Sequence, residues 1–239
     1  MTAGYPNRDV TIPLLERLTD VGADVIELGI PFSDPLADGP IIQRSSFEAL
    51  QNGTTVASVL ADLRAFRAGN DAPVVLFSYL NPILAYGLEA LLSDAVAAGA
   101  NGILLTDLPT GADPKVEATI SESPLALIRL IAPTTRFERI TKVTHGGSGF
   151  VYYISRTGVT GARAELRKSL TEELDRIRSV VSLPVAVGFG ISTPEQAASV
   201  AAVADGVVVG SALIQALDKG GIDAGADFLQ SLRIGMDRG

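Results

Sequence analysis

Short apolar runs alternate with longer amphipathic segments along the whole chain of 239 residues. The segments between the runs repeat apolar residues at helical spacing, as in Leu14, Leu15, Leu18 and Val21, which share one helical face. This alternation is typical of a parallel sheet built from βα units. Strands are expected at 24–30, 74–79, 102–107, 125–131, 149–155, 185–189 and 206–209, and helices at 10–17, 42–67, 84–97, 113–121, 136–144, 164–181, 194–203, 211–218 and 223–234.

A weak internal repeat supports one architecture. VGADVIELGIP (21–31), AGANGILLTDLP (98–109) and VADGVVVGSAL (203–213) each place small residues at a helix end, then Asp or Asn, a strand and a turn. Seven strands are countable, and MTAGYP at the start of the chain hints at an eighth. Eight evenly spaced units with no linker favour an α/β (β/α)8 TIM barrel in a single domain, 1–239, over an open doubly wound sheet.

Composition excludes several classes of protein. A net charge of −8 argues against a general nucleic-acid binder, which needs a basic face. The absence of cysteine removes thiol nucleophiles and disulfides, and the one histidine, His145, rules out a multi-histidine metal site. His145 is interpreted as structural. No signal peptide or apolar run of transmembrane length is recognised, so the cytoplasm is the expected compartment.

The segment ELGIPFSDPLADGP (27–40) places a carboxylate in an apolar strand and hangs an acidic, proline-stiffened loop on its end. Because side chains alternate along a strand, Glu27 shares a face with Val25 and Gly29 and is expected to point into the barrel. A buried glutamate has a raised pKa and can donate a proton near neutral pH, although it could equally pair with an arginine for structural reasons. Asp34 and Asp38 could be held for chemistry or could only satisfy their own loop.

Glycine-containing turns follow the last three expected strands: SRTGVTG (155–161), GFGIS (188–192) and VGSAL (209–213). In barrels, the loops after the last two strands often bind phosphate, and Gly210 and Ser211 begin a short helix whose N-terminus favours an anion. The three turns could also be merely structural. Arg156 and Arg163 lie in or beside a Gly- and Thr-rich loop, which is either a mobile lid or a solvent-exposed loop.

Taken together, these segments resemble the tryptophan synthase alpha subunit family. The likeness covers nearly the whole chain, through ELGIPFSDPLADGP, FSYLNPILAYG (77–87), TDLP (106–109), YYISRTGVTGAR (152–163), GFGISTPEQ (188–196) and VVGSAL (208–213). It implies a lyase that cleaves indole-3-glycerol phosphate into indole and glyceraldehyde 3-phosphate by a retro-aldol reaction. Glu27 would be the general acid–base, and Asp38 would bind the indole N–H and stabilise the positive charge that develops on the ring.

The resemblance also implies the rest of the site. Tyr152 would shape the substrate pocket, Phe77, Leu104 and Phe189 would contact the indole, and Gly161, Gly190, Gly210 and Ser211 would bind the phosphate. Thr160 would reach Asp38 when the loop after strand 6 closes. The implied partner is the β subunit, in a heterotetramer of two α and two β chains. The β subunit would carry pyridoxal phosphate, so no cofactor and no metal are expected in this chain.

One departure from the family pattern stands at the start, where the chain begins directly at the TAGYP-like turn. The usual N-terminal helix and most of strand 1 are then missing, and the first strand is expected to be truncated. Restoring about 15–20 upstream residues should raise the melting temperature if the barrel needs that closure. Three other functions compete with the main one: a stand-alone lyase, a non-catalytic allosteric partner of the β subunit, and a sugar-phosphate isomerase. The intact carboxylates, tyrosine and phosphate turns argue against the non-catalytic partner. An isomerase would explain the phosphate turns but not Glu27 and Asp38.

Overall fold

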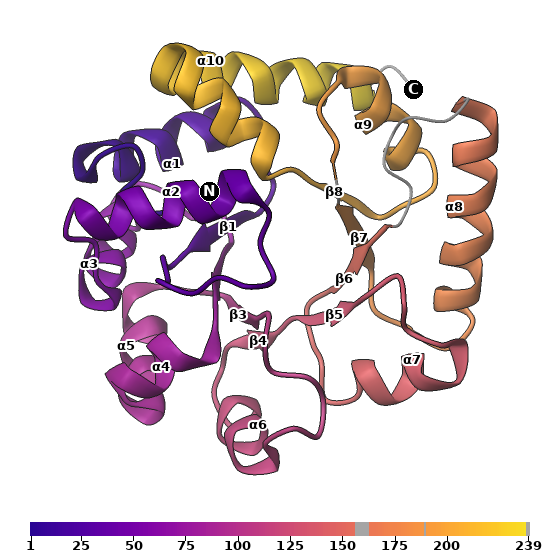
Figure 1. Ribbon diagram of the computed structural model, residues 1–239, viewed down its shortest axis with the longest axis horizontal. Helices are drawn as coiled ribbons and strands as arrows, with labels where there is room; N and C mark the ends of the chain where they lie inside the picture. The colour runs from indigo at the N-terminus through magenta and orange to yellow at the C-terminus, as the bar shows by residue number, and fades with distance from the viewer. Residues whose placement is uncertain (156–162, 189, 238–239) are drawn as a thin grey trace.

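The computed structural model describes residues 1–155, 163–188 and 190–237, with the side chains of 163–168 left out. Parallel strands form its centre, and helices surround them in a ring that Figure 1 shows in a view down the barrel. The strands are β1 (Ile26–Gly29), β2 (Val74–Ser78), β3 (Gly102–Leu105), β4 (Ala126–Leu127), β5 (Arg129–Ile131), β6 (Val151–Ile154), β7 (Val185–Gly188) and β8 (Gly206–Val208).

The strands pair in chain order, β1-β2-β3-β4 and β5-β6-β7-β8, and every pair is parallel. Only Ile128 separates β4 from β5, so the expected strand 125–131 is one run that serves two ladders. The hint of a further strand at the start corresponds to one parallel bridge, Thr2 to Gly29. Gly29 N–H donates to the Met1 carbonyl at 2.7 Å, and Ala3 N–H donates to the Gly29 carbonyl at 2.9 Å.

Two expected helices prove to be pairs of helices. The expected helix 42–67 breaks at Gly53, which has a φ of 77°, and at Thr55, whose side chain caps the second helix. The expected helix 84–97 starts earlier and breaks at Gly87, which has a φ of 101°. The helical elements are η1 (Arg8–Val10), α1 (Thr11–Asp20), α2 (Pro40–Gln51), α3 (Val56–Phe66), α4 (Leu80–Tyr86), α5 (Leu88–Ala98), α6 (Pro114–Ser121), α7 (Phe137–Thr144), α8 (Arg163–Arg178), α9 (Pro194–Ala201) and α10 (Ser211–Asp237).

Helix α10 contains non-helical backbone at Gly220 and Gly221, so it is two helices in succession, as the sequence predicts. It lies beside α1, α2 and α9, so the last helical element packs against the first helices of the chain (Figure 1). Within the described part of the chain, no helix combines the length and the apolar character that crossing a bilayer requires.

The two faces of the strands pack in different layers. Ile26 and Leu28 of β1 are buried in the outer layer, between the strands and the helices. A separate cluster fills the barrel interior, and its buried members are Val75, Leu104 and Ile128. This division follows from the alternation of side chains along each strand. The positions that face the interior are therefore the ones that can line an active site.

Three arginine side chains explain the internal repeat at the amino-terminal ends of the strands. In each case an arginine at or near the end of a helix donates to a loop carbonyl and to the side chain of the Asp or Asn two residues after that carbonyl. That Asp or Asn occurs in each of the three repeated segments. In each of them it is hydrogen-bonded to an arginine from a helix, which joins the helix to the loop before the strand. The three ties are Arg67 to Gly99 and Asn101, Arg178 to Val203 and Asp205, and Arg233 to Gly22 and Asp24.

Candidate active site

Glu27 lies in the barrel interior, as its strand position predicts. In the β1–β2 register it stands opposite Val75, a member of the interior cluster, while its neighbours Ile26 and Leu28 face the helices. One carboxylate oxygen, Oε1, is buried and accepts no hydrogen bond from the described residues. No arginine among the residues that the structure describes forms an ion pair with Glu27, and Oε1 is available to a ligand that enters the barrel.

The environment of Glu27 favours its protonated form. Burial raises the pKa of the Glu27 carboxyl to about 7, and attraction to the Met1 amino group opposes part of that rise. A carboxyl with a pKa near 7 is close to half protonated at neutral pH. It can therefore act as either a proton donor or a proton acceptor under those conditions.

Asp38 is held in a fixed position within the loop after β1. The Tyr79 hydroxyl donates to Asp38 Oδ2 at 2.9 Å, and the same hydroxyl accepts the Ala37 N–H at 2.9 Å. Gln43 Nε2 at the start of α2 donates to the Asp38 carbonyl at 2.9 Å. Burial raises the pKa of Asp38, and the Tyr79 hydrogen bond lowers it. Asp34, by contrast, is exposed, so the structure separates the two loop aspartates.

Tyr79 is a site residue that sequence analysis did not identify, although it lies in the FSYLNP motif. It follows β2 and is 5% exposed. Burial, followed by the hydrogen bond and the charge of Asp38, raises the pKa of Tyr79 to about 12, so it is a neutral hydroxyl and a hydrogen-bond donor. Tyr79 and Asp38 are 41 positions apart along the sequence, so no local sequence pattern predicts their contact.

Tyr152 lies within the electrostatic reach of both carboxylates. Burial raises the pKa of its hydroxyl, and the charges of Glu27 and Asp38 raise it further. Gly188 of β7 makes room for this side chain, because a Cβ there would lie 2.5 Å from the Tyr152 hydroxyl oxygen. Sequence analysis assigned Gly188 only to a phosphate turn, so its place under Tyr152 is a finding of the structure.

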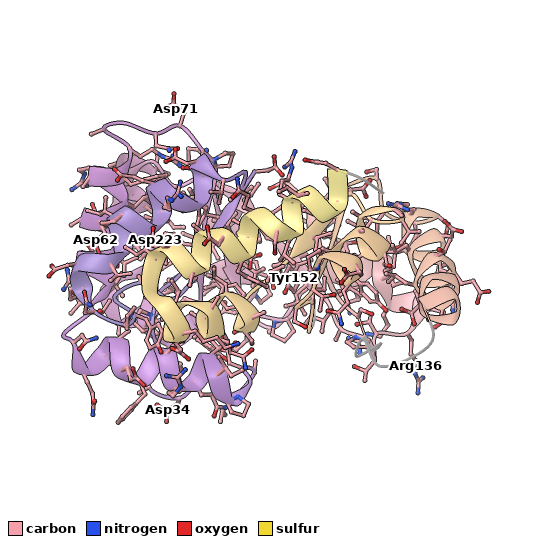
Figure 2. All side chains as sticks on the ribbon, turned by 90° about the horizontal axis from the view of Figure 1, so that it is seen from above. Asp34, Asp62, Asp71, Arg136, Tyr152 and Asp223 are labelled. Atoms are coloured by element: carbon pink, nitrogen blue, oxygen red, sulfur yellow. The ribbon has the colours of Figure 1, made fainter. Side chains whose placement is uncertain are left out.

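Phe77 and Leu104 line the same interior as Tyr152. All three belong to the apolar cluster inside the barrel, and Phe77 stands opposite Leu104 in the β2–β3 register. In the side view of Figure 2, Tyr152 lies in the interior, whereas Asp34 and Arg136, in the loops after β1 and β5, lie at one edge. Asp38 belongs to the same loop after β1 as Asp34, whereas Glu27 and the apolar cluster lie along the strands in the interior.

The structure describes three of the residues expected to bind phosphate, Gly190, Gly210 and Ser211. Gly190 has a φ of 69°, a conformation that favours glycine. Gly210 and Ser211 are exposed at the start of α10, and a Cβ at Gly210 would meet only Ile42 Cδ1, at 4.0 Å. The first N–H groups of a helix have no acceptor within the helix, so this end can receive an anion. Thr160, Gly161 and Phe189 lie outside the described residues.

Two other features stand apart from this constellation. His145 is an exposed residue at the end of α7. A hollow of about 390 Å³ opens beside Thr134, Thr135, Arg136, Arg139 and Val143, and neither Glu27 nor Asp38 lines it. In the described residues, no group of three or more His, Cys, Asp or Glu side chains is placed to hold a metal ion.

The fold and this site together define a (β/α)8-barrel enzyme with one acidic residue inside the barrel and another in the loop after β1. A family model described as "Tryptophan synthase alpha chain" matches residues 1–232. The tryptophan synthase alpha chain of Geotalea daltonii is 51% identical over 219 residues, which are 92% of this chain and 83% of that protein. The alpha chain of Geobacter sulfurreducens is 49% identical over 219 residues, with 92% and 83% covered.

Solved structures agree with the sequence relatives. The tryptophan synthase alpha subunit of Legionella pneumophila superposes with a TM-score of 0.90 at 39% identity, covering 100% of this chain and 91% of that one. A chain from Mycobacterium tuberculosis tryptophan synthase gives a TM-score of 0.88 at 36% identity, with 99% and 90% covered. The chain belongs to the tryptophan synthase alpha chain family. It is accordingly a lyase of tryptophan biosynthesis that cleaves indole-3-glycerol phosphate to indole and D-glyceraldehyde 3-phosphate.

Proposed function

We propose that Glu27 and Asp38 carry the chemistry of this cleavage. The observation that supports the proposal most directly is the buried Glu27 carboxyl, which has a pKa near 7 and an oxygen without a hydrogen-bond partner among the described residues. Breaking the bond between indole C3 and the glycerol chain needs a proton delivered to a carbon. A positioned acid contributes about 10²–10⁴-fold to such a step. Glu27 gives its proton to C3 and assists the loss of the glycerol hydroxyl proton.

Asp38 stabilises the positive charge that this proton transfer creates on the indole ring. When C3 takes up a proton, positive charge develops on the indole nitrogen, and an ionised carboxylate beside the N–H stabilises it. The Tyr79 hydrogen bond supports this role in two ways, because it lowers the pKa of Asp38 against the effect of burial and fixes one carboxylate oxygen. A carboxylate that is already oriented has no reorganisation to undergo in the transition state.

The two ends of the substrate occupy different surroundings. The indole ring packs on Phe77, Leu104, Tyr152 and Phe189, of which the first three share the interior cluster. The phosphate binds the backbone N–H groups at Gly161, Gly190, Gly210 and Ser211, where a helix N-terminus supplies the positive end of a dipole. Holding both ends places the scissile bond between Glu27 and Asp38. Thr160 reaches Asp38 when its loop closes and water is excluded.

The expected partner is a β subunit that carries pyridoxal phosphate and takes up the indole, so this chain needs neither a cofactor nor a metal. The partner would face the loop from Pro31 to Pro40 and the segment after β6. Leu36 in that loop is 90% exposed, which suits a surface that another protein covers. A heterotetramer of two α and two β chains in the cytoplasm completes the proposal.

The test is an assay of indole release from indole-3-glycerol phosphate, run with and without a β subunit. Glu27→Gln should reduce kcat by at least ~10²-fold, because the amide cannot give up a proton. Asp38→Asn keeps the shape of the loop and removes the charge, and it should reduce kcat with a smaller effect on the binding of glycerol 3-phosphate. A native rate for Glu27→Gln would overturn the assignment of the acid.

A further inference from the structure

Three side chains from distant parts of the chain meet at the seam between its beginning and its end. Tyr5 lies in the turn after the Thr2–Gly29 bridge, Arg44 lies on α2, and Asp218 lies near the end of the first helical part of α10. The Tyr5 hydroxyl donates to Asp218 Oδ1, and Arg44 Nη2 donates to Asp218 Oδ2. Arg44 Nη1 donates to the Tyr5 hydroxyl at 2.7 Å, so each member contacts the other two. We call this group the seam triad.

Within the seam triad each member bonds to both of the others, and Arg44 Nη1 donates in addition to Glu48 Oε1 on the same helix, at 3.2 Å. Tyr5 is 2% exposed, and a buried hydroxyl needs a hydrogen-bond partner. Both oxygens of Asp218 are used, one for each neighbour, and the Arg44 guanidinium also lies 5.5 Å from the centre of the Tyr5 ring. Burial and the Asp218 hydrogen bond raise the pKa of Tyr5 to about 12, so its hydroxyl keeps its proton. Removing any one member leaves the others with unmet hydrogen-bonding capacity.

On one side, the seam triad includes a residue of α2, the helix that follows the acidic loop. Arg44 lies next to Gln43, whose side chain donates to the Asp38 carbonyl at 2.9 Å. Further contacts tie α2 to the N-terminal turn along its length: the Thr2 and Ser45 hydroxyls are 2.8 Å apart, and Asn52 Nδ2 donates to the Pro6 carbonyl at 2.7 Å. The position of Asp38 therefore depends on the position of α2 relative to the N-terminal turn.

On the other side, the seam triad includes a residue of α10, the helix that begins at the expected phosphate turn. Ser211 is the first residue of α10, and Asp218 lies seven residues later, about 10 Å along the helix axis at 1.5 Å per residue. The helix is continuous between them, because the non-helical residues Gly220 and Gly221 come only after Asp218. In Figure 1, α10 passes beside α2 at this seam. A shift of Asp218 would therefore move Gly210 and Ser211 as well.

We propose that Tyr5, Arg44 and Asp218 are positioning residues for the cleavage reaction: they fix the phosphate-binding start of α10 relative to Asp38. This proposal rests on the proposed function, since it assumes that the substrate phosphate binds at Gly210 and Ser211 and the indole at Asp38. The substrate spans these two points, so their separation decides whether its scissile bond lies at Glu27. An error of about 1 Å in such a placement costs on the order of 10²-fold in rate.

The experiment compares Arg44→Gln and Asp218→Asn with a matched pair elsewhere. Arg178 and Asp205 also form an arginine–aspartate pair, with side chains 36% and 45% exposed against 43% and 31% for Arg44 and Asp218. That pair lies at the amino-terminal ends of the strands, away from the site. Arg178→Gln is therefore the control for the loss of a similar ion pair. For each variant, kcat, KM, the Kd of glycerol 3-phosphate and the melting temperature are measured.

We expect Arg44→Gln and Asp218→Asn to lower kcat/KM by about tenfold or more, with the Kd of glycerol 3-phosphate nearly unchanged, because each half of the site stays intact and only their relation is lost. Arg178→Gln should lower the melting temperature by a similar amount and leave kcat/KM native. Arg44→Lys keeps the charge and should restore most of the lost kcat/KM.

Two outcomes would overturn the proposal and leave the seam triad as a stabilising contact only. One is an equal kinetic effect of Arg178→Gln and Arg44→Gln. The other is native kinetics for Arg44→Gln and Asp218→Asn. Glu27→Gln, measured in parallel, separates this failure from a failure of the proposed function. If Glu27→Gln is inactive while the seam variants are native, only the positioning proposal is lost. If Glu27→Gln is native, the catalytic assignment itself is wrong.

Discussion

The hydroxyl of Tyr79 donates a hydrogen bond of 2.9 Å to Asp38 Oδ2, and the Tyr79 hydroxyl oxygen accepts the N–H of Ala37 at 2.9 Å. One side chain at the end of β2 thus fixes both the carboxylate and the backbone of the acidic loop that follows β1. The indole-binding carboxylate we propose is therefore supported by the neighbouring strand and not by its own loop alone.

Tyr79→Phe should lower kcat by about tenfold or more, since a hydrogen bond to a charged group is worth about 1.5–3 kcal/mol. The Tyr79 hydrogen bond lowers the pKa of Asp38, so its removal should shift the acidic limb of the pH–rate profile to higher pH. Tyr86→Phe is the control, because Tyr86 donates in the same way to Asp94 at 2.6 Å, outside the site. An unmoved acidic limb in Tyr79→Phe would show that this contact does not tune Asp38.

Glu27 should make the stability of the fold depend on pH. The folded-state pKa of about 7 lies above the usual value of 4.5, so the folded protein binds more protons than the unfolded chain between these two values. Stability is therefore lost as the pH rises through this window. Glu27→Gln should melt at a higher temperature than the native chain at pH 8, and the difference should disappear at or below pH 4.5.

The control for that measurement is Glu172→Gln, a change at an exposed position of α8. Its melting curve should follow that of the native chain at every pH. A constant difference between Glu27→Gln and the native chain from pH 4 to pH 8 would contradict the buried, protonatable state of Glu27.

Gly188→Ala should displace Tyr152. The added Cβ would lie 2.5 Å from the Tyr152 hydroxyl oxygen and 3.0 Å from the ring carbon that bears it. We expect a raised KM for indole-3-glycerol phosphate and a destabilisation of about 1–3 kcal/mol from overpacking. Adding Tyr152→Phe removes the atom that clashes most closely, so the double variant should recover part of the lost stability.

Gly69→Ala provides the comparison, because nothing lies within 4 Å of a Cβ at Gly69. It should leave both stability and KM close to native values. If the effects of Gly188→Ala and Tyr152→Phe on stability simply add, the contact between the two positions is not the cause.

Arg67→Ala should destabilise the fold without changing the reaction. The Arg67 guanidinium donates to the carbonyls of Gly99, Asn70 and Ala72 and to the Asn101 side chain, at 2.6–2.9 Å. The loss of this tie should cost about 2–3 kcal/mol in the free energy of unfolding, measured by urea denaturation, because several loop acceptors lose their donor at once. Arg64→Ala, on the exposed side of the same helix, should cost less than about 0.5 kcal/mol.

Local patterns predicted the elements and the direction of Glu27. The period of two along β1 places Glu27 opposite to Ile26 and Leu28, and this relation involves only adjacent residues. The predicted helices 42–67 and 84–97 were wrong in their continuity. Their apolar periodicity runs through Gly53 and Gly87, but each glycine has a positive φ that interrupts the helix. The carboxylate loop and the glycine turns were found because each is a continuous stretch of sequence.

The amino-acid sequence by itself determined the order of strands and helices, the family, and which residue types stand at the ends of the strands. Only the tertiary structure decided that Tyr79 holds Asp38, that Gly188 makes room for Tyr152, and that Tyr5, Arg44 and Asp218 meet at the seam. The partners in these contacts are up to 213 positions apart along the chain. Periodicity and turn chemistry act over a few residues, whereas such contacts exist only once the sheet has brought the strands and the helices around it together.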